Sequence, residues 1–259
     1  MFDDEPYYII DLGEVEKAYK RWMLNLPDIH PYYAMKCNPN PRILQVLMKL
    51  GCNFDCASKE EIHQILAITE GDASRIIFAH PCKYPSHLCY AEEEGVNLMT
   101  FDCEEELYKI KKYHKYAKVL LRLAVDDSQS LCQFNKKFGC KEADIDKVLK
   151  TAKQLGMNLV GFSFHVGSGC KSAYTYYDAI RRCHDAMIIA EGYGFSVGMI
   201  DVGGGFVAHG GSVTFEDIAA KINEAKEDFF AGSNVRFIAE PGRFMVQKSH
   251  TLICTVVAK

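Results

Sequence analysis

The hydrophobic positions of this 259-residue chain fall into short apolar runs that alternate with longer amphipathic segments. Runs such as Val119–Leu121 are apolar at every position, which is typical of parallel strands buried on both faces. Eight such β/α units predict an α/β protein with a closed (β/α)8 barrel of the TIM type, rather than an open doubly wound sheet. The eight predicted strands are Tyr32–Lys36, Asn53–Cys56, Ile76–Ala79, Leu98–Phe101, Val119–Val125, Leu159–Phe164, Met199–Asp201 and Val235–Ala239.

The segments between these runs carry the spacing and the end signals of helices. Apolar residues recur at helical spacing through Asp144–Leu155. Ser58–Glu61 and Asp102–Glu105 have the spacing of a capping box, in which the first side chain and the fourth bond each other's backbone. Glycines are expected to end several of the helices; they are Gly51, Gly95 and Gly156.

Two further strand-like runs lie outside the eight units. Tyr7–Ile10 precedes a helix predicted to start at Leu12, and Thr251–Val257 lies close to the last residue. An apolar strand without a partner in the closed barrel would be an aggregation-prone edge. We therefore expect residues 12–248 to form the barrel, and residues 1–11 and 249–259 to belong to a second, β-rich domain. Most of that domain is absent from this sequence, so the chain is expected to be a fragment.

Composition narrows the possible functions. The 30 Lys and Arg against 34 Asp and Glu give a net charge of −4, which does not favour a nucleic-acid partner. No apolar run approaches the roughly 18 residues of a membrane helix, and the acidic start lacks a secretory signal. Eleven cysteines without CxxC spacing indicate reduced thiols in a cytoplasmic protein. The nine histidines show neither HxxxH nor HExxH spacing, so no metal site is expected.

Candidate functional residues stand where the predicted strands end, because barrels collect their active sites on those loops. Nearly every such position holds a residue that is capable of chemistry. The set comprises Lys36, Asp55, Pro81–Lys83, Asp102, Asp126–Asp127, His165, Gly203–Gly205 and Glu240.

Three of these features together indicate pyridoxal phosphate. Lys36 is expected to enter the barrel, where desolvation would lower its pKa and free its amine as a nucleophile, although a surface lysine is the alternative. Gly203–Gly205 and Arg243, on adjacent loops, favour a phosphate group, although the glycines could only form a turn. Glu240 could keep the pyridine nitrogen of the cofactor protonated while His165 stacks on its ring. A carboxylate at the pyridine nitrogen favours decarboxylation over racemisation.

These residues also lie in motifs that resemble those of the eukaryotic ornithine decarboxylases, a branch of the barrel-type, alanine-racemase-like pyridoxal phosphate enzymes. The resemblance runs from Tyr7 to Lys259. The motifs are Tyr33–Asn38, Phe54–Ser58, Pro81–Lys83, Phe164–Gly169, Asp201–Gly205 and Glu240–Arg243. The resemblance implies that Lys36 forms a Schiff base with the cofactor and lies beside Asp55. It also implies that Lys36, Asp55 and His165 act in catalysis. The cofactor-binding residues it implies are Lys36, Asp55, His165, Ser168, Gly204, Gly205, Glu240, Pro241, Gly242 and Arg243.

The resemblance further implies that L-ornithine is converted to putrescine and CO2 by a cytoplasmic homodimer with shared active sites. In this family the proton-donating and substrate-binding groups come from the second domain of the other subunit. The present chain alone is therefore expected to be inactive. An antizyme-type regulatory protein is a possible partner.

Two departures from the family pattern leave alternatives open. Gln133 stands nearest the place where the family usually has an arginine, and His80 stands where it often has asparagine. One alternative is a noncatalytic regulator similar to the antizyme inhibitors, which share the fold and bind a partner protein. Another is a lysine, arginine or diaminopimelate decarboxylase, because one methylene of substrate length is discriminated only modestly.

Overall fold

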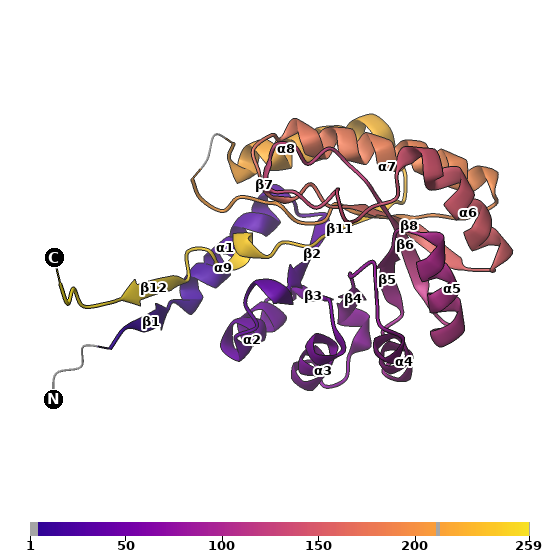
Figure 1. Ribbon diagram of the computed structural model, residues 1–259. Coiled ribbons are helices and arrows are strands. Elements are labelled where there is room, and N and C mark those ends of the chain that lie inside the picture. The colour runs from indigo at the N-terminus through magenta and orange to yellow at the C-terminus, as the bar shows by residue number, and fades with distance from the viewer. Residues whose placement is uncertain (1–4, 211–212, 259) are drawn as a thin grey trace.

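The computed structural model describes residues 5–210 and 213–258 and confirms the predicted barrel. Eight parallel strands close in the order β10-β11-β2-β3-β4-β5-β6-β8, and the helices surround them (Figure 1). The barrel strands are β2 (Ile29–Ala34), β3 (Asn53–Cys56), β4 (Ile76–Phe78), β5 (Leu98–Phe101), β6 (Lys118–Leu123), β8 (Asn158–Phe164), β10 (Met199–Asp201) and β11 (Arg236–Ala239).

The helices alternate with these strands, as the amphipathic segments predict. Within the described residues, none of them is long and apolar enough to cross a bilayer. They are α1 (Leu12–Asn25), α2 (Pro41–Lys49), α3 (Lys59–Ile68), α4 (Pro85–Glu93), α5 (Glu104–Tyr113), α6 (Ile145–Gln154), α7 (Tyr174–Gly192), α8 (Phe215–Phe230) and α9 (Arg243–Val246). Short 3-10 turns are η1 (Met35–Cys37), η2 (Ala73–Arg75) and η3 (Glu142–Asp144).

The apolar side chains form two layers, as expected for strands that are buried on both faces. The larger layer lies between the sheet and the helices and includes Trp22, Phe54 and Phe162. A small cluster fills the barrel interior; its members are Tyr32, Ile77, Ala79, Leu120 and Ile238. The barrel is therefore a packed core, and the polar groups at its carboxyl end stand on a rigid base.

Two predicted strands need correction: the structure has Ile29–Ala34 in place of Tyr32–Lys36 and His250–Ile253 in place of Thr251–Val257. The first barrel strand ends at Ala34, because the chain enters the 3-10 turn η1 at Met35. Lys36 consequently lies on a tight turn rather than on the strand. The predicted helix-ending glycines at 51, 95 and 156 all adopt the left-handed conformation.

One predicted capping box is half formed and the other is wrong. Ser58 Oγ accepts from the Glu61 N–H at 3.2 Å, but the Glu61 carboxylate bonds the N–H of Ala57 instead of that of Ser58. Asp102 does not cap α5, since its carboxylate accepts from the N–H of Gly139.

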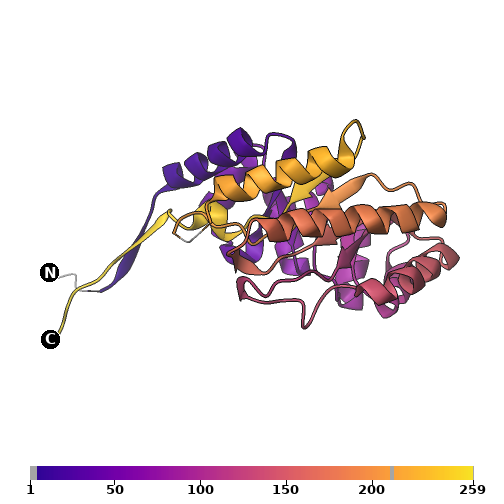
Figure 2. The ribbon, with the colours of Figure 1, turned by 90° about the horizontal axis from the view of Figure 1, so that it is seen from above.

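The two terminal strands pair with each other outside the barrel. β1 (Tyr7–Ile10) runs antiparallel to β12 (His250–Ile253), and together they form a two-stranded ribbon. Figures 1 and 2 show this ribbon projecting away from the barrel. Its apolar side chains are exposed; Tyr8 is 63% and Leu252 49% exposed.

Two short strands form a separate antiparallel pair at the carboxyl end of the barrel. β7 (Ser130–Cys132) pairs antiparallel with β9 (Ser168–Cys170) and joins the loop that follows β6 to the loop that follows β8. The pairing places Cys132 opposite Ser168, one of the predicted cofactor residues.

Candidate active site

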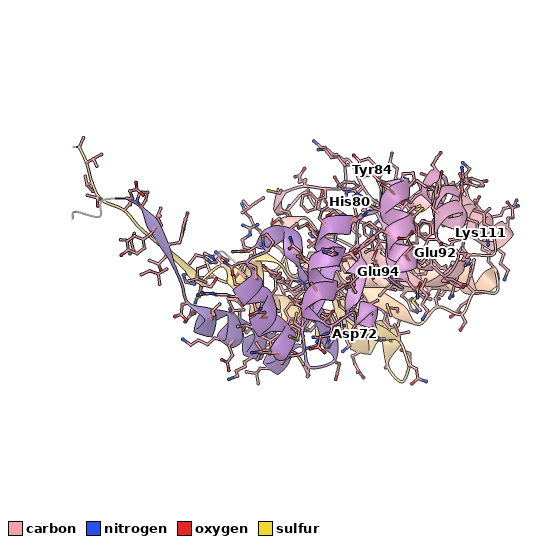
Figure 3. All side chains as sticks on the ribbon, turned by 90° about the horizontal axis from the view of Figure 1, so that it is seen from below. Asp72, His80, Tyr84, Glu92, Glu94 and Lys111 are labelled. Carbon is pink, nitrogen blue, oxygen red and sulfur yellow. The ribbon has the colours of Figure 1, made fainter. Side chains whose placement is uncertain are left out.

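The predicted chemical residues lie at one end of the barrel. Figure 3 shows His80, just after β4, at the end of the molecule opposite Asp72, which precedes β4. Since all barrel strands are parallel, their carboxyl ends share the side of His80. Asp55 lies near the end of β3 and Arg243 begins α9, whereas the residues on the connecting turns and loops are Lys36, His165, Gly203–Gly205 and Glu240.

The Lys36 amine forms an ion pair with the carboxylate of Asp55. Lys36 Nζ lies 2.5 Å from Asp55 Oδ2; the Asp55 side chain is fully buried, whereas that of Lys36 is half exposed. Burial acts to lower the pKa of the Lys36 amine, but the carboxylates of Asp55 and Glu240 outweigh burial and raise that pKa. The predicted lowering of the Lys36 pKa is therefore wrong for the ligand-free chain, since two carboxylates face the amine.

Two further carboxyl groups are buried next to this pair. Burial raises the pKa of Asp201 to about 7. Burial, followed by repulsion from Asp201 and Asp55, holds the pKa of Glu240 well above its usual range. Glu240 Oε1 and Asp201 Oδ2 are both buried without a hydrogen-bond donor. The site thus contains carboxyl oxygens that call for a donor or a positive charge.

These raised pKa values predict how the stability of the ligand-free protein depends on pH. A carboxyl with a raised pKa binds its proton more tightly in the folded than in the unfolded chain, so its contribution is fully present below about pH 4. That contribution is lost as the pH rises through about 7. We expect the Asp201→Asn variant, measured by thermal unfolding, to lose less stability than the parent protein over this range.

Asp28→Asn, which changes an exposed aspartate, is the matched control for this experiment. It should reproduce the pH dependence of the parent protein. If Asp201→Asn reproduced it as well, Asp201 could not be the group that destabilises the folded chain at higher pH.

His165 follows β8 and is held as a neutral imidazole. Its Nδ1 accepts from the N–H of Gly167 at 3.0 Å, which assigns the ring proton to Nε2. Burial, together with the nearby positive charges of Arg122 and Lys36, holds the pKa of His165 well below its ordinary value. An uncharged, fixed ring of this kind can stack on a planar ligand.

The glycine-rich loop after β10 packs closely against the loop of His165. Gly205 has a φ of +100°, and a Cβ there would lie 2.4 Å from the carbonyl oxygen of Gly167, so no other residue fits without a backbone shift. Beside it, the Arg243 guanidinium bonds the hydroxyl of Ser168. This guanidinium, the hydroxyl and the close backbone form a site suited to a phosphate group.

Three of the residues at predicted strand ends serve the structure instead, and one of them is Asp127, whose carboxylate accepts from the N–H groups of Phe134 and Asn135. Lys83 is buried and pairs with Glu106, with Lys83 Nζ 2.8 Å from Glu106 Oε1. Asp102 binds the backbone of Gly139, as described above. The Lys83 amine is therefore not free to contact a ligand, and one oxygen of Asp102 is occupied by backbone.

Sequence reasoning missed two residues of the site. Arg122 lies on β6, and the charges that act on it come first from Glu240 and then from Asp102 and Asp201. Arg122 is the charged residue in the otherwise apolar predicted strand Val119–Val125, and a charge at such a position could have indicated a functional role. Asp201 was assigned to a motif but not to the site. Gln133 is exposed, and its side-chain amide donates to the carbonyl oxygen of Ser128.

An inward lysine paired with a buried carboxylate, a second carboxyl without a donor and a phosphate-shaped loop define a barrel-type pyridoxal phosphate site. The sequence matches the family described as "Pyridoxal-dependent decarboxylase, pyridoxal binding domain" over residues 12–247. The chain therefore belongs to the family of pyridoxal-dependent decarboxylases, and its cofactor is pyridoxal phosphate.

Curated relatives and solved structures agree with this assignment. The chain is 44% identical to the ornithine decarboxylase of Neurospora crassa over 99% of this chain and 52% of the relative. It is 40% identical to that of Mus musculus, covering 56% of that protein. The arginine decarboxylase of Paramecium bursaria Chlorella virus superposes with a TM-score of 0.92 at 37% identity, covering 96% of this chain and 67% of that one. The ornithine decarboxylase of Entamoeba histolytica gives a TM-score of 0.88 at 33% identity, with coverages of 98% and 70%. The chain thus spans about half the length of the curated relatives it matches.

Proposed function

We propose that the protein to which this barrel belongs decarboxylates L-ornithine, releasing CO2 and putrescine. The observation that carries the proposal is the Lys36–Asp55 ion pair, which lies within the electrostatic reach of the buried carboxyl of Glu240. The choice of ornithine is supported by the curated relatives, which are ornithine decarboxylases at 40% to 44% identity.

The residues present fit the cofactor at four points. Lys36 Nζ would hold it covalently, with Asp55 as the counterion of the amine whenever that amine is free. Glu240 Oε1, buried without a donor, would accept from a protonated pyridine nitrogen. Ser168 and Arg243 would bind its phosphate together with the backbone of Gly204, Gly205, Pro241 and Gly242, and the neutral ring of His165 would face the pyridine ring.

The chain's own groups explain why decarboxylation suits this site. When bound, pyridoxal phosphate supplies an electron sink for the pair left behind as CO2 departs. A carboxylate at the ring nitrogen keeps that nitrogen protonated and so strengthens the sink. Arg122 places a positive charge among the three carboxyl groups of the site and limits their mutual repulsion.

The domain organisation and partners form part of the proposal. The exposed apolar ribbon of β1 and β12 supports the assignment of residues 1–11 and 249–259 to a second β domain, with residues 12–248 as the barrel. We propose a homodimer in which that domain completes the site of the other subunit. An antizyme-type regulator remains a proposed partner. A cytoplasmic location is supported by the eleven free thiols.

A substrate comparison on the full-length protein tests the proposal. Loaded with pyridoxal phosphate, the protein should release CO2 from L-ornithine with a higher kcat/KM than from L-lysine, L-arginine or diaminopimelate. A preference for one of these would replace ornithine as the substrate. Failure to bind the cofactor would overturn the enzymatic proposal and favour a noncatalytic regulator, for which capture of a partner protein would be the next measurement.

A further inference from the structure

The segment 126–139, which follows β6, is attached to the site at several points. It contains β7, whose pairing with β9 ties it to the chain that carries His165 and Ser168. Ser130 Oγ also donates to the carbonyl oxygen of Val166. The segment therefore lies over the mouth of the barrel as part of the wall of the site.

Two carboxylates, one fully buried and one partly buried, hold the backbone of this segment. The fully buried Asp127 accepts from the N–H groups of Phe134 and of Asn135, the latter at 2.8 Å. At the end of the segment, Asp102 Oδ2 accepts from the Gly139 N–H at 2.9 Å. Gly139 has a φ of +102°, and a Cβ there would lie 2.7 Å from the backbone of Ala124, so the segment must leave through a glycine.

Two phenylalanine rings of the segment reach the site residues. The Phe134 ring meets the His165 ring edge to face, with centroids 5.0 Å apart. The Phe138 ring lies between His80, at 5.9 Å between centroids, and the Arg122 guanidinium carbon, at 5.3 Å from its centroid. Both phenylalanine side chains are partly exposed, so they contact the site residues from its solvent-facing side.

We propose that Phe134 is a positioning residue that fixes the plane of the His165 ring for stacking on the cofactor, an inference that rests on the proposed function. The hydrogen bond from Gly167 fixes only Nδ1, and the ring is otherwise restrained by its packing. The edge-to-face contact supplies that restraint because the positive rim of one ring attracts the negative face of the other. Asp127 acts one step further away, since it holds the backbone of Phe134.

The first test measures the affinity of the full-length protein for pyridoxal phosphate, together with the induced circular dichroism of the bound cofactor. Phe134→Ala should weaken binding about 3- to 10-fold and change the dichroism, which reports the orientation of the pyridine ring. Phe134→Tyr keeps the ring and should restore both values. Phe229→Ala, which removes a ring packed 5.6 Å from His184 outside the site, is the matched control and should change neither.

The second test uses the ligand-free protein and so does not depend on the cofactor. NMR titration of His165, assigned with a His165→Gln variant, should show the imidazole pKa of the Phe134→Ala variant rising toward its ordinary value as water reaches the ring. The charges that face this ring, Arg122 and Lys36, are unchanged in that variant. If Phe134→Ala does not fold, Phe134→Leu serves in its place, with the same direction expected.

The outcomes separate the two proposals. Parent-like cofactor affinity and dichroism in Phe134→Ala, or an equal loss in Phe134→Tyr, would overturn the role of Phe134 while leaving the proposed function intact. A parent protein that binds no pyridoxal phosphate would overturn the proposed function, and the His165 titration would then decide whether Phe134 shapes the environment of that ring.

Discussion

The Lys36→Ala variant of the full-length protein is expected to lose covalent attachment of pyridoxal phosphate completely. Borohydride reduction followed by peptide mass spectrometry should find the cofactor on the peptide that contains Lys36 in the parent protein and nowhere in the variant. Turnover of ornithine should fall by on the order of 10^4-fold, because the amine that would hold the cofactor covalently and could transfer protons in the site is removed. Noncovalent binding should persist through the phosphate contacts of Ser168 and Arg243.

A matched control for this variant is Lys59→Ala, which removes a lysine from the first position of α3, close behind β3. It should keep both the covalent label and the turnover. A reduced label that stayed on the Lys36→Ala protein would show that another amine binds the cofactor, and the assignment of Lys36 would then be wrong.

The rate of covalent cofactor attachment should depend on the protonation state of the Lys36 amine. Its amine has a raised pKa because Asp55 and Glu240 face it, whereas attack on an aldehyde requires the neutral amine. We therefore expect covalent attachment to become faster as the pH rises through the neutral range, measured by stopped-flow absorbance. A rate that did not change with pH would indicate that the cofactor enters with the proton already removed from Lys36.

The barrel could be predicted from the sequence because each strand is marked by its own residues. Apolar runs of the right length, separated by amphipathic segments, located all eight strands. The errors arose where other residues compete for a backbone or side-chain group. Asp102 does not cap its own helix, because its carboxylate accepts from the N–H of Gly139, and the Glu61 carboxylate bonds the N–H of Ala57 instead of that of Ser58. Gly139 is far from Asp102 in the sequence, so local spacing could not reveal this partner.

The site was predictable in its residues but not in its electrostatics. The strand-end rule found Lys36, Asp55, His165 and Glu240 because parallel strands bring their ends together. It missed Arg122, which lies within a strand. The separate expectation that desolvation lowers the pKa of Lys36 was wrong. The direction of that pKa shift depends on how many carboxylates face the amine, which is a property of the closed barrel and not of any single loop.

The Glu106→Ala variant is expected to lose more stability than any other single change considered for the barrel. Glu106 is buried between two lysines, with Oε1 at 2.8 Å from Lys83 Nζ and Oε2 at 2.6 Å from Lys109 Nζ. Lys83 Nζ also donates to the carbonyl of Thr100 at 2.6 Å, and burial lowers the pKa of this amine. Removing Glu106 leaves that ammonium buried without a counterion, which costs about 3–5 kcal/mol. For a domain of this size, thermal unfolding should show the midpoint falling by roughly 6–20 °C.

Two further variants distinguish a lost ion pair from a lost helix residue. Glu105→Ala changes the exposed neighbour on α5 and should alter stability by less than about 0.5 kcal/mol. The double variant Lys83→Met/Glu106→Leu removes both buried charges and should recover most of the loss, because a buried pair replaced by apolar groups of similar volume is often neutral. Lys109 can then turn to solvent, since its side chain is already 25% exposed. If the double variant were as unstable as Glu106→Ala, packing at this position rather than the unpaired charge of Lys83 would set the stability.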